Sequence, residues 1–217
     1  YRVASFGTTD HRGPGFRRAA KLTTPEAPDL EQMFRSTVDS GCRHAVMEVS
    51  SHAIELKRVE RLSFDVVAFT NLSAEHLDFH GGMENYFRVK QRLFTGLQGV
   101  PPPVAILNRD DSHFEELSRS GNGTCLSFGL TSDADIFPKE FSFDSHGLTA
   151  EFETPRGSFV LRSELMGRLN LYNVATAVAI GLALDLPKGS IVDGIGALRT
   201  VPGRFEFVDH GQPFPVI

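Results

Sequence analysis

The chain has 217 residues, of which 41% are apolar and 23% charged, a composition typical of globular proteins and not of disordered, collagen-like or disulfide-rich ones. Its formal net charge of -5 excludes a broad cationic surface of the kind that binds a nucleic-acid backbone. No apolar run approaches the roughly 18 to 20 residues of a membrane span, so we expect a soluble protein.

The cysteines and the chain ends add two expectations. Cys42 and Cys125 are too few for a disulfide framework, so both are expected to be core thiols in a reducing cytoplasm. The chain begins at Tyr1 without an initiator methionine and ends on the apolar run 214–217. Because natural termini are usually polar, these ends predict a piece of a longer protein.

Strand-like and helix-like segments alternate through the first two thirds of the chain, which predicts an α/β fold with a mostly parallel sheet. The apolar spacing predicts a helix over 29–40 that includes Val38, with Gly41 as its C-terminal cap. A continuous apolar run predicts a strand at 44–49. Such a run indicates a strand that is covered on both faces.

Similar runs predict strands at 64–70 and 104–108, also covered on both faces. Ser112 and Glu115 match a capping box that opens the next helix. Together these segments continue the alternation of strand and helix that a parallel sheet requires.

The last third of the chain has a different pattern. Alternating segments from about 124 to 163 predict a small antiparallel meander. Helices are predicted at about 170–185 and 188–198, and the following Pro-Gly turn predicts a domain boundary near residue 204.

Lys90 is the first candidate for chemistry, because it falls on the apolar stripe of a predicted helix. Burial disfavours its ammonium, and a neutral amine can act as a base, form a Schiff base or add CO2 to give a metal-binding carbamate. The alternative is a lysine whose stem packs on the core while its ammonium reaches solvent, and the stripe alone favours this alternative. The stripe consists of Met83, Tyr86, Phe87, Leu93, Phe94 and Leu97.

Glu48 and His76 are candidate metal ligands. Glu48 interrupts the apolar strand 44–49, and buried carboxylates usually have a partner or a metal. His76 lies in a polar loop after the next strand, so both residues are expected at carboxyl ends of strands, where ligands bind in open α/β folds. With a carbamate on Lys90 they would supply ligands suited to Mg2+ beside phosphates. A lone loop histidine is, however, more often structural.

Thr23 and Thr24 precede the first full helix, and Pro25 is predicted at its first position. Exposed hydroxyls and backbone N–H groups at a helix N-terminus bind anions, although simple capping explains the same pattern. Nearby cationic residues either contact a phosphate or form a solvated face. They are Arg17, Arg18, Lys21, Lys57 and Arg58.

Several short strings in the chain resemble the Mur ligase family, and specifically its MurE type, which adds the third residue to the peptidoglycan precursor UDP-N-acetylmuramoyl-L-alanyl-D-glutamate. The strings match in order and spacing and extend over essentially the whole chain. They are Thr23-Thr24-Pro25, Met47-Glu48-Val49-Ser50-Ser51-His52, Thr70-Asn71-Leu72, His76-Leu77-Asp78-Phe79-His80-Gly81, Tyr86 to Lys90 with Leu93-Phe94, Asn108-Arg109-Asp110-Asp111, Gly167-Arg168-Leu169-Asn170-Leu171-Tyr172-Asn173 and Val201-Pro202-Gly203-Arg204-Phe205-Glu206.

The resemblance implies a three-domain, ATP-dependent amide ligase with a P-loop-NTPase-like, mostly parallel sheet and a small antiparallel sheet. Residues 1–203 would be the central ATPase-type domain, and 204–217 the start of the C-terminal domain. The P-loop that cradles ATP phosphates is expected before residue 1, and the domain that selects the incoming amino acid is expected after Ile217.

The resemblance also assigns roles to individual residues. Contacts to the UDP-muramoyl dipeptide are implied for Thr23, Thr24, Ser50 and Arg58. Glu48 and His76 look like Mg2+ ligands, and Lys90 matches the family's carbamylated lysine. ATP contacts are implied for Asn170, Asn173 and Arg204.

Three positions depart from the family pattern. Glu75 stands where an aspartate is usual, so it changes the length of a carboxylate near His76. Leu56 replaces a glutamine of some relatives, which puts one hydrogen bond to substrate in doubt. The segment 7–23 is rich in arginine where a short apolar-polar hairpin is expected.

The implied reaction activates the D-glutamyl carboxylate with the ATP γ-phosphate, and the amine of a diamino acid then attacks the acyl phosphate. We expect meso-diaminopimelate rather than lysine, although the discriminating motif is expected beyond Ile217. A monomeric cytoplasmic enzyme is expected, and residues 1–217 alone are expected to be inactive. The alternatives are a folylpolyglutamate synthase-like ligase and a non-catalytic nucleotide-sugar-binding module.

Overall fold

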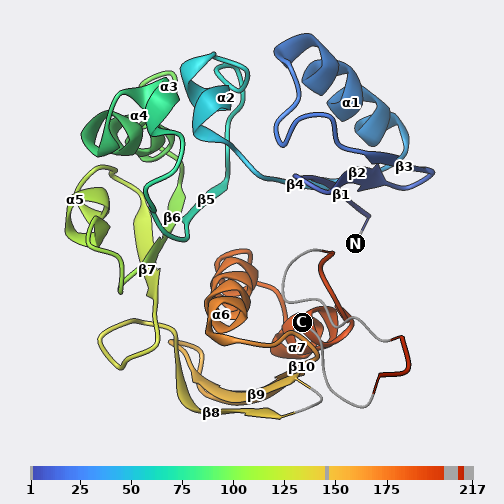
Figure 1. Cartoon of the computed structure of the whole chain (residues 1–217), viewed down its shortest axis with the longest axis vertical. Helices are drawn as coiled ribbons and strands as arrows, with labels where there is room; N and C mark the ends of the chain where they lie inside the picture. Colours follow the sequence, from blue (N-terminus) through green and yellow to red (C-terminus); the bar gives the residue numbers. More distant parts are fainter. Residues whose placement is uncertain (1, 145–146, 203–209, 213–217) are drawn as a thin grey trace. The chain divides into compact units, whose positions relative to one another are not determined.

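The computed structural model describes residues 2–144, 147–202 and 210–212 (Figure 1). The chain forms two compact units. The first unit comprises residues 1–63 and 74–101, and the second comprises 64–73 and 102–217. In the described ranges, no helix has both the length and the apolar character needed to cross a membrane.

The first unit contains a four-stranded mixed sheet with the strand order β3-β2-β1-β4. Its strands are β1 (Val3–Phe6), β2 (Asp10–Gly13), β3 (Phe16–Ala19) and β4 (His44–Met47). β1 pairs with β4 in parallel, whereas β1, β2 and β3 form antiparallel pairs. The helix α1 (Ala27–Asp39) packs on this sheet through Met33, which shares a buried cluster with Ala4, Phe6 and Cys42.

Three further helices complete the first unit. They are α2 (Ser51–Glu55), α3 (Leu77–His80) and α4 (Met83–Thr95). α4 packs against α2 and α3 and buries Tyr86, Phe87, Val89 and Phe94, which confirms the helix predicted from the apolar stripe.

The second unit joins a parallel sheet to an antiparallel one. Its parallel strands are β5 (Val66–Phe69), β6 (Val104–Asn108) and β7 (Thr124–Phe128). The antiparallel strands are β8 (Phe137–Asp144), β9 (Gly147–Glu153) and β10 (Phe159–Ser163). The helices are α5 (Phe114–Ser118), α6 (Arg168–Ala183) and α7 (Lys188–Gly196).

α6 holds the two sheets of the second unit together. It contacts the parallel strands, and its buried face shares one core with residues of β9 and β10 (Figure 1). The fully buried side chains of this core include Ile106, Phe128, Phe152 and Leu161. The predicted α/β class is therefore confirmed, with a parallel sheet, flanking helices and a small antiparallel sheet.

Two strand predictions are corrected. β7 belongs to the parallel sheet, so the antiparallel meander begins at Phe137 and not near residue 124. β4 is the edge strand of its sheet, and Val46 is 55% exposed, so the predicted cover on both faces is wrong for this strand. β5 and β6 contain no exposed residue, as predicted.

Details of the first helix also differ from the prediction. α1 begins at Ala27 after Glu26, so Pro25 precedes the helix and Pro28 occupies its first turn. Val38 lies outside the buried face and is 63% exposed. Gly41 has a φ of +79° directly after the capping residue, a conformation that favours glycine, as its predicted capping role requires.

The capping box and one core thiol were predicted wrongly. α5 begins after His113, one residue later than a cap at Ser112 requires, and Glu115 pairs with Arg109 and Arg119 instead. Cys42 is buried, but Cys125 is exposed on the edge strand β7. The predicted boundary near residue 204 lies outside the described residues.

His11 gives the first unit a predicted pH dependence. His11 is 5% exposed, and burial lowers the pKa of this imidazole, with the charge of Arg18 lowering it further. Since the unfolded chain retains the ordinary value of 6.5, the unfolded state binds more protons just below that pH. We therefore expect the free energy of unfolding to fall as the pH drops through that value.

Denaturant unfolding between pH 5 and 8, compared for the wild type and His11→Phe, measures this effect. In His11→Phe, the free energy of unfolding should decrease less than in the wild type as the pH falls below 6.5. An identical pH profile in both proteins would show that His11 is not its source.

Candidate functional site

The predicted site residues fall into two groups, one in each unit. The first unit holds Thr23, Thr24, Glu48, Ser50, Arg58, His76 and Lys90. The second unit holds Asn170 and Asn173, while Arg204 lies outside the described residues. Most of these residues lie in short loops between elements or near helix starts, whereas Lys90 lies within α4.

Thr24 joins the segment before α1 to the segment between β4 and α2. Its side chain is fully buried, and its hydroxyl donates to the backbone carbonyl of Glu48 over 2.8 Å. The same oxygen accepts the backbone N–H of Ser50 over 3.1 Å. The prediction of an exposed Thr24 hydroxyl is therefore wrong, because two backbone groups engage it.

Glu48 differs from its prediction in a similar way. The strand β4 ends at Met47, and Glu48 is exposed rather than buried within the strand. Its carboxylate accepts a 2.6 Å hydrogen bond from the hydroxyl of Thr8, which is also 3.1 Å from the hydroxyl of Thr23. An exposed carboxylate beside two hydroxyls remains accessible to a cation or a polar ligand.

Ser50 and Arg58 lie at opposite ends of α2. Ser50 is the N-terminal cap, and its hydroxyl accepts the backbone N–H of Ala53 over 3.2 Å. The Arg58 guanidinium donates to the Thr24 carbonyl over 3.2 Å and forms a 2.7 Å ion pair with Glu26. Thr24 is thus bonded to the residues at both ends of this helix.

A cluster of rings surrounds His76. His76 caps α3 in the left-handed conformation, with a φ of +58°, which costs a non-glycine residue about 1 kcal/mol or more. The ring centre of His52 lies 4.9 Å from that of His76 and 4.1 Å from that of Phe79. His80 is buried, stacks on Tyr86 at 4.8 Å, and its Nε2 lies 2.9 Å from the Ser51 hydroxyl.

Tyr86 brings two of the predicted ligands to one aromatic ring. The Nζ atom of Lys90 lies 5.2 Å from the centre of the Tyr86 ring, and the His76 ring lies 6.2 Å from it. Lys90 is half-buried, as its place on the apolar stripe predicts. Burial raises the pKa of Tyr86, and the nearby Glu75 carboxylate raises it further, so Tyr86 stays neutral at physiological pH.

In the second unit, the Asn108-Arg109-Asp110-Asp111 string fixes the loops after β5 and β6. The Asn108 side chain donates to the Thr70 carbonyl over 2.7 Å and accepts the Asp110 N–H over 3.0 Å. Asp111 accepts the Leu72 N–H over 3.1 Å. These bonds hold the carboxyl ends of the two neighbouring strands in register.

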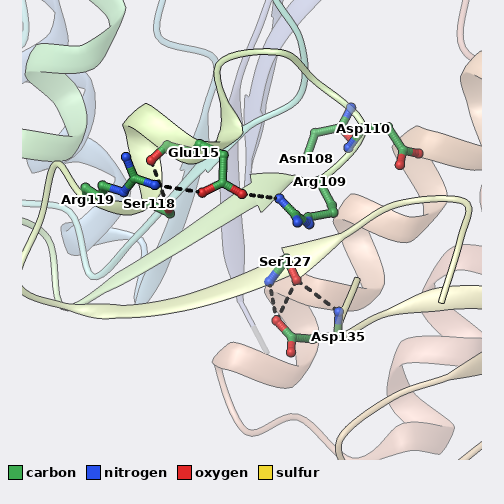
Figure 2. Close-up of polar contacts among 8 residues, drawn as sticks. All are labelled: Asn108, Arg109, Asp110, Glu115, Ser118, Arg119, Ser127 and Asp135. Atoms are coloured by element: carbon green, nitrogen blue, oxygen red, sulfur yellow. Dashed lines mark hydrogen bonds and ion pairs between the residues drawn. The ribbon is translucent and has the colours of Figure 1, made fainter. Parts of the chain in front are cut away.

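Figure 2 shows the polar contacts that surround this loop. The carboxylate of Glu115 lies between the guanidinium groups of Arg109 and Arg119, at 2.7 and 3.2 Å. Asp135 accepts both the backbone N–H and the hydroxyl of Ser127, which fixes the chain that follows β7.

The start of α6 carries the two asparagines. Asn170 is buried, and its amide donates to the Met166 carbonyl over 2.8 Å. Asn173 is exposed and donates to the Asn170 side-chain oxygen over 3.1 Å. One turn of the helix therefore holds both amides in a fixed orientation. The Tyr172 hydroxyl donates to Asp110 over 2.8 Å, which connects this turn to the loop after β6.

Residues 2–181 match the protein family described as the Mur ligase middle domain, and this range includes every site residue named above except Arg204. The chain belongs to this family.

Relatives and solved structures agree with this assignment. The chain is 42% identical over 215 residues to a UDP-N-acetylmuramoyl-L-alanyl-D-glutamate--2,6-diaminopimelate ligase of Solibacter usitatus, which covers 99% of the chain and 44% of the relative. A ligase of the same name from Bacillus licheniformis is 44% identical over 202 residues, covering 91% of the chain and 41% of the relative. A solved structure of a ligase with this name matches with a TM-score of 0.84 at 28% identity, covering 96% of this chain and 43% of the other. The chain thus spans less than half the length of these relatives.

Several residues that organise this Mur ligase middle domain had no predicted role. Thr8 and Tyr86 contact predicted site residues, and Ser51 contacts His80, yet none of the three is charged or unusually placed in the sequence. His52 and His80 fall within the strings that resemble the family, but only the folded loops bring them beside His76 and Tyr86. The sequence therefore pointed to His52 and His80 as members of the family strings, but it did not show which residues they contact.

The Thr24 hydroxyl allows a direct test in this Mur ligase domain. Thr24→Val keeps the side-chain volume but leaves the Ser50 N–H and the Glu48 carbonyl without the buried Thr24 hydroxyl as partner, which should lower the free energy of unfolding by about 1 to 3 kcal/mol. Thr95→Val is the matched control, because its hydroxyl is exposed and it should cost less than about 0.5 kcal/mol.

Urea unfolding of both variants and the wild type measures the difference. Equal stability of the two variants would contradict the bridging role of Thr24.

Proposed function

We propose that the complete protein is an ATP-dependent amide ligase that joins a diamino acid, meso-diaminopimelate, to UDP-N-acetylmuramoyl-L-alanyl-D-glutamate. Membership of the Mur ligase middle domain family, over residues 2–181, carries this proposal. The relatives at 42% and 44% identity, whose names describe this reaction, support the choice of substrates. Predicted site residues lie in the described part of both units, which supports the proposal.

The first unit would bind the UDP-muramoyl dipeptide. The Thr23 hydroxyl, the Ser50 cap and the Arg58 guanidinium supply hydroxyl and cationic contacts for carboxylates and phosphates. Thr24 orients Ser50 and the Glu48 backbone through its two hydrogen bonds. These residues would hold the reacting carboxylate in place, and positioning of this kind supplies much of the acceleration in phosphoryl transfer.

Glu48 and His76 are the proposed protein ligands of Mg2+. Within the described ranges, no group of three His, Cys, Asp or Glu residues forms a complete metal shell. Mg2+ usually takes one or two protein carboxylates and completes its shell with water and substrate phosphates. The exposed Glu48 carboxylate and the exposed His76 ring fit such a donor set. The ion would neutralise charge as the carboxylate and the γ-phosphate approach.

Lys90 would add an oxygen ligand as a carbamate. In this modification the neutral amine forms a bond to the carbon of CO2, and the proton released by nitrogen goes to solvent. The amine that would take part in this addition belongs to a half-buried side chain, and its Nζ atom lies 5.2 Å from the centre of the Tyr86 ring. Tyr86 would help to orient both residues, because Lys90 Nζ lies over its ring and the His76 ring lies nearly perpendicular to it.

The second unit would contact ATP through Asn170 and Asn173, and Arg204 would contribute a cationic contact. The hydrogen bond between the two asparagine side chains leaves the exposed Asn173 at the start of α6, where helix amides also favour anions. Since the dipeptide substrate is made in the cytoplasm, we place the enzyme there, as a monomer.

The role of Lys90 is tested with the complete protein and purified UDP-muramoyl dipeptide, ATP and meso-diaminopimelate. We expect the wild type to form the tripeptide product, and Lys90→Ala to lose about 100- to 1,000-fold in kcat because one charged ligand is missing. Acetate should restore part of this activity, since its carboxylate replaces the carbamate. Lys139→Ala, on the exposed edge strand β8, is the control and should remain fully active.

Full activity of Lys90→Ala without acetate would overturn the carbamate assignment. Turnover of folate and glutamate in place of the muramoyl substrate would instead favour a folylpolyglutamate synthase-like ligase. Binding of the nucleotide sugar without turnover would favour a non-catalytic module.

The contact between Tyr172 and Asp110 predicts a selective effect on ATP. Tyr172→Phe removes the hydroxyl that ties the α6 turn to the loop after β6, so the KM for ATP should rise about three- to tenfold while kcat changes little. Asp110→Asn should give a similar rise, and the double variant should add nothing further. Steady-state kinetics with Asp133→Asn, an exposed carboxylate, as control measures the effect. Unequal single variants that add fully in the double variant would show that the two groups act independently.

A further inference from the structure

The Arg58 side chain is mostly buried and makes two side-chain contacts. Its side chain is only 13% exposed, and its Nε atom is buried without a hydrogen-bond partner in the described part of the chain. Nη1 donates to the Thr24 carbonyl over 3.2 Å, and Nη2 lies 2.7 Å from the Glu26 carboxylate. Glu26 therefore makes the shortest contact of this guanidinium among the interactions described above.

Glu26 precedes α1 but its side chain does not cap this helix. It occupies the N-terminal capping position of α1, where Ser, Thr, Asp and Asn side chains commonly accept backbone N–H groups of the first turn. No side-chain capping hydrogen bond is formed there, and the carboxylate extends to Arg58 instead. The charge of Glu26 is thus directed to a residue 32 positions later in the sequence.

With this ion pair, the segment from Thr24 to Glu26 is bonded to residues at both ends of α2. At the start of α2, the Thr24 hydroxyl holds Ser50 and Glu48. At its end, the Arg58 N–H donates to the Ala53 carbonyl over 2.8 Å, and the Arg58 side chain returns to Thr24 and Glu26. Among the described residues, the 3.2 Å bond to the Thr24 carbonyl would be the remaining side-chain hydrogen bond of the guanidinium if the Glu26 carboxylate were removed.

We propose that Glu26 is a positioning residue that sets the Arg58 guanidinium for recognition of an anionic group of the UDP-muramoyl dipeptide. This inference rests on the proposed function. An anchored guanidinium loses less conformational freedom when it binds an anion, and its charge-assisted hydrogen bonds are directional. Glu26 acts through Arg58 and touches no reacting atom.

The experiment uses the complete protein with two variants, Glu26→Ala and Glu26→Gln. Isothermal titration calorimetry gives the Kd for the UDP-muramoyl dipeptide without ATP, and steady-state kinetics gives kcat and both KM values. Asp39→Asn is the control, because Asp39 lies at the other end of α1 in an exposed ion pair with Arg35.

We expect Glu26→Ala to weaken dipeptide binding about three- to tenfold and to raise its KM equally, with kcat and the KM for ATP unchanged. Glu26→Gln should lose less, because its amide oxygen still accepts a hydrogen bond from Arg58. Asp39→Asn should bind like the wild type. This separation of KM from kcat is not expected from a general loss of stability.

Three other results would be decisive. Equal binding by the wild type and both Glu26 variants would overturn the positioning role while leaving the ligase assignment intact. Tighter binding by Glu26→Ala would also overturn it, because Glu26 would then compete with the substrate for Arg58. Failure of the wild type to bind the dipeptide would overturn the proposed function itself, and this inference with it.

Discussion

The fully buried hydroxyl of Thr24 is the interaction on which the first unit's candidate site depends. It satisfies a carbonyl and an N–H on either side of Val49, so the segment between β4 and α2 is fixed without regular secondary structure. Because buried backbone groups are costly when unpaired, this one side chain determines where Glu48 and Ser50 are placed. Arg58 then bonds the Thr24 carbonyl, which connects the far end of α2 to the same residue.

The ring cluster around Tyr86 is a second organising feature, and it is built differently. Its members come from α2, α3 and α4 and contact one another through ring faces and edges rather than through a network of charged groups. His80 is buried here, and burial lowers the pKa of its imidazole, with the neighbouring His52 lowering it further. The cluster holds His76 in a left-handed conformation that an isolated histidine would rarely adopt.

Much of the fold could be predicted from the sequence because periodicity reports burial directly. The apolar stripe from Met83 to Leu97 predicted α4, in which Lys90 is half-buried. The apolar runs at 64–70 and 104–108 predicted the parallel strands β5 and β6. β7 was assigned to the wrong sheet because five alternating residues are compatible with either kind of neighbour. The burial of Glu48 was misjudged because an apolar run does not reveal that its strand lies at a sheet edge and ends before the carboxylate.

The candidate site was predictable as a set of residues but not as a set of contacts. The family strings contain the residues of these contacts without showing which of them pair. That His80 meets Ser51 and Tyr86, and that Asp110 meets Tyr172, becomes evident only when separate segments fold together. Hydrogen bonds between loops distant in sequence leave no periodic signal.

The route of the chain through the two units has a consequence for synthesis and truncation. Residues 64–73 leave the first unit to supply β5 to the second, and residues 74–101 return to complete the first. Neither unit is therefore one continuous stretch, and no single cut in the chain can release either of them whole. During translation the first unit cannot close until residue 101 has emerged, by which time an edge strand of the second unit is already outside the ribosome and still lacks its partner β6.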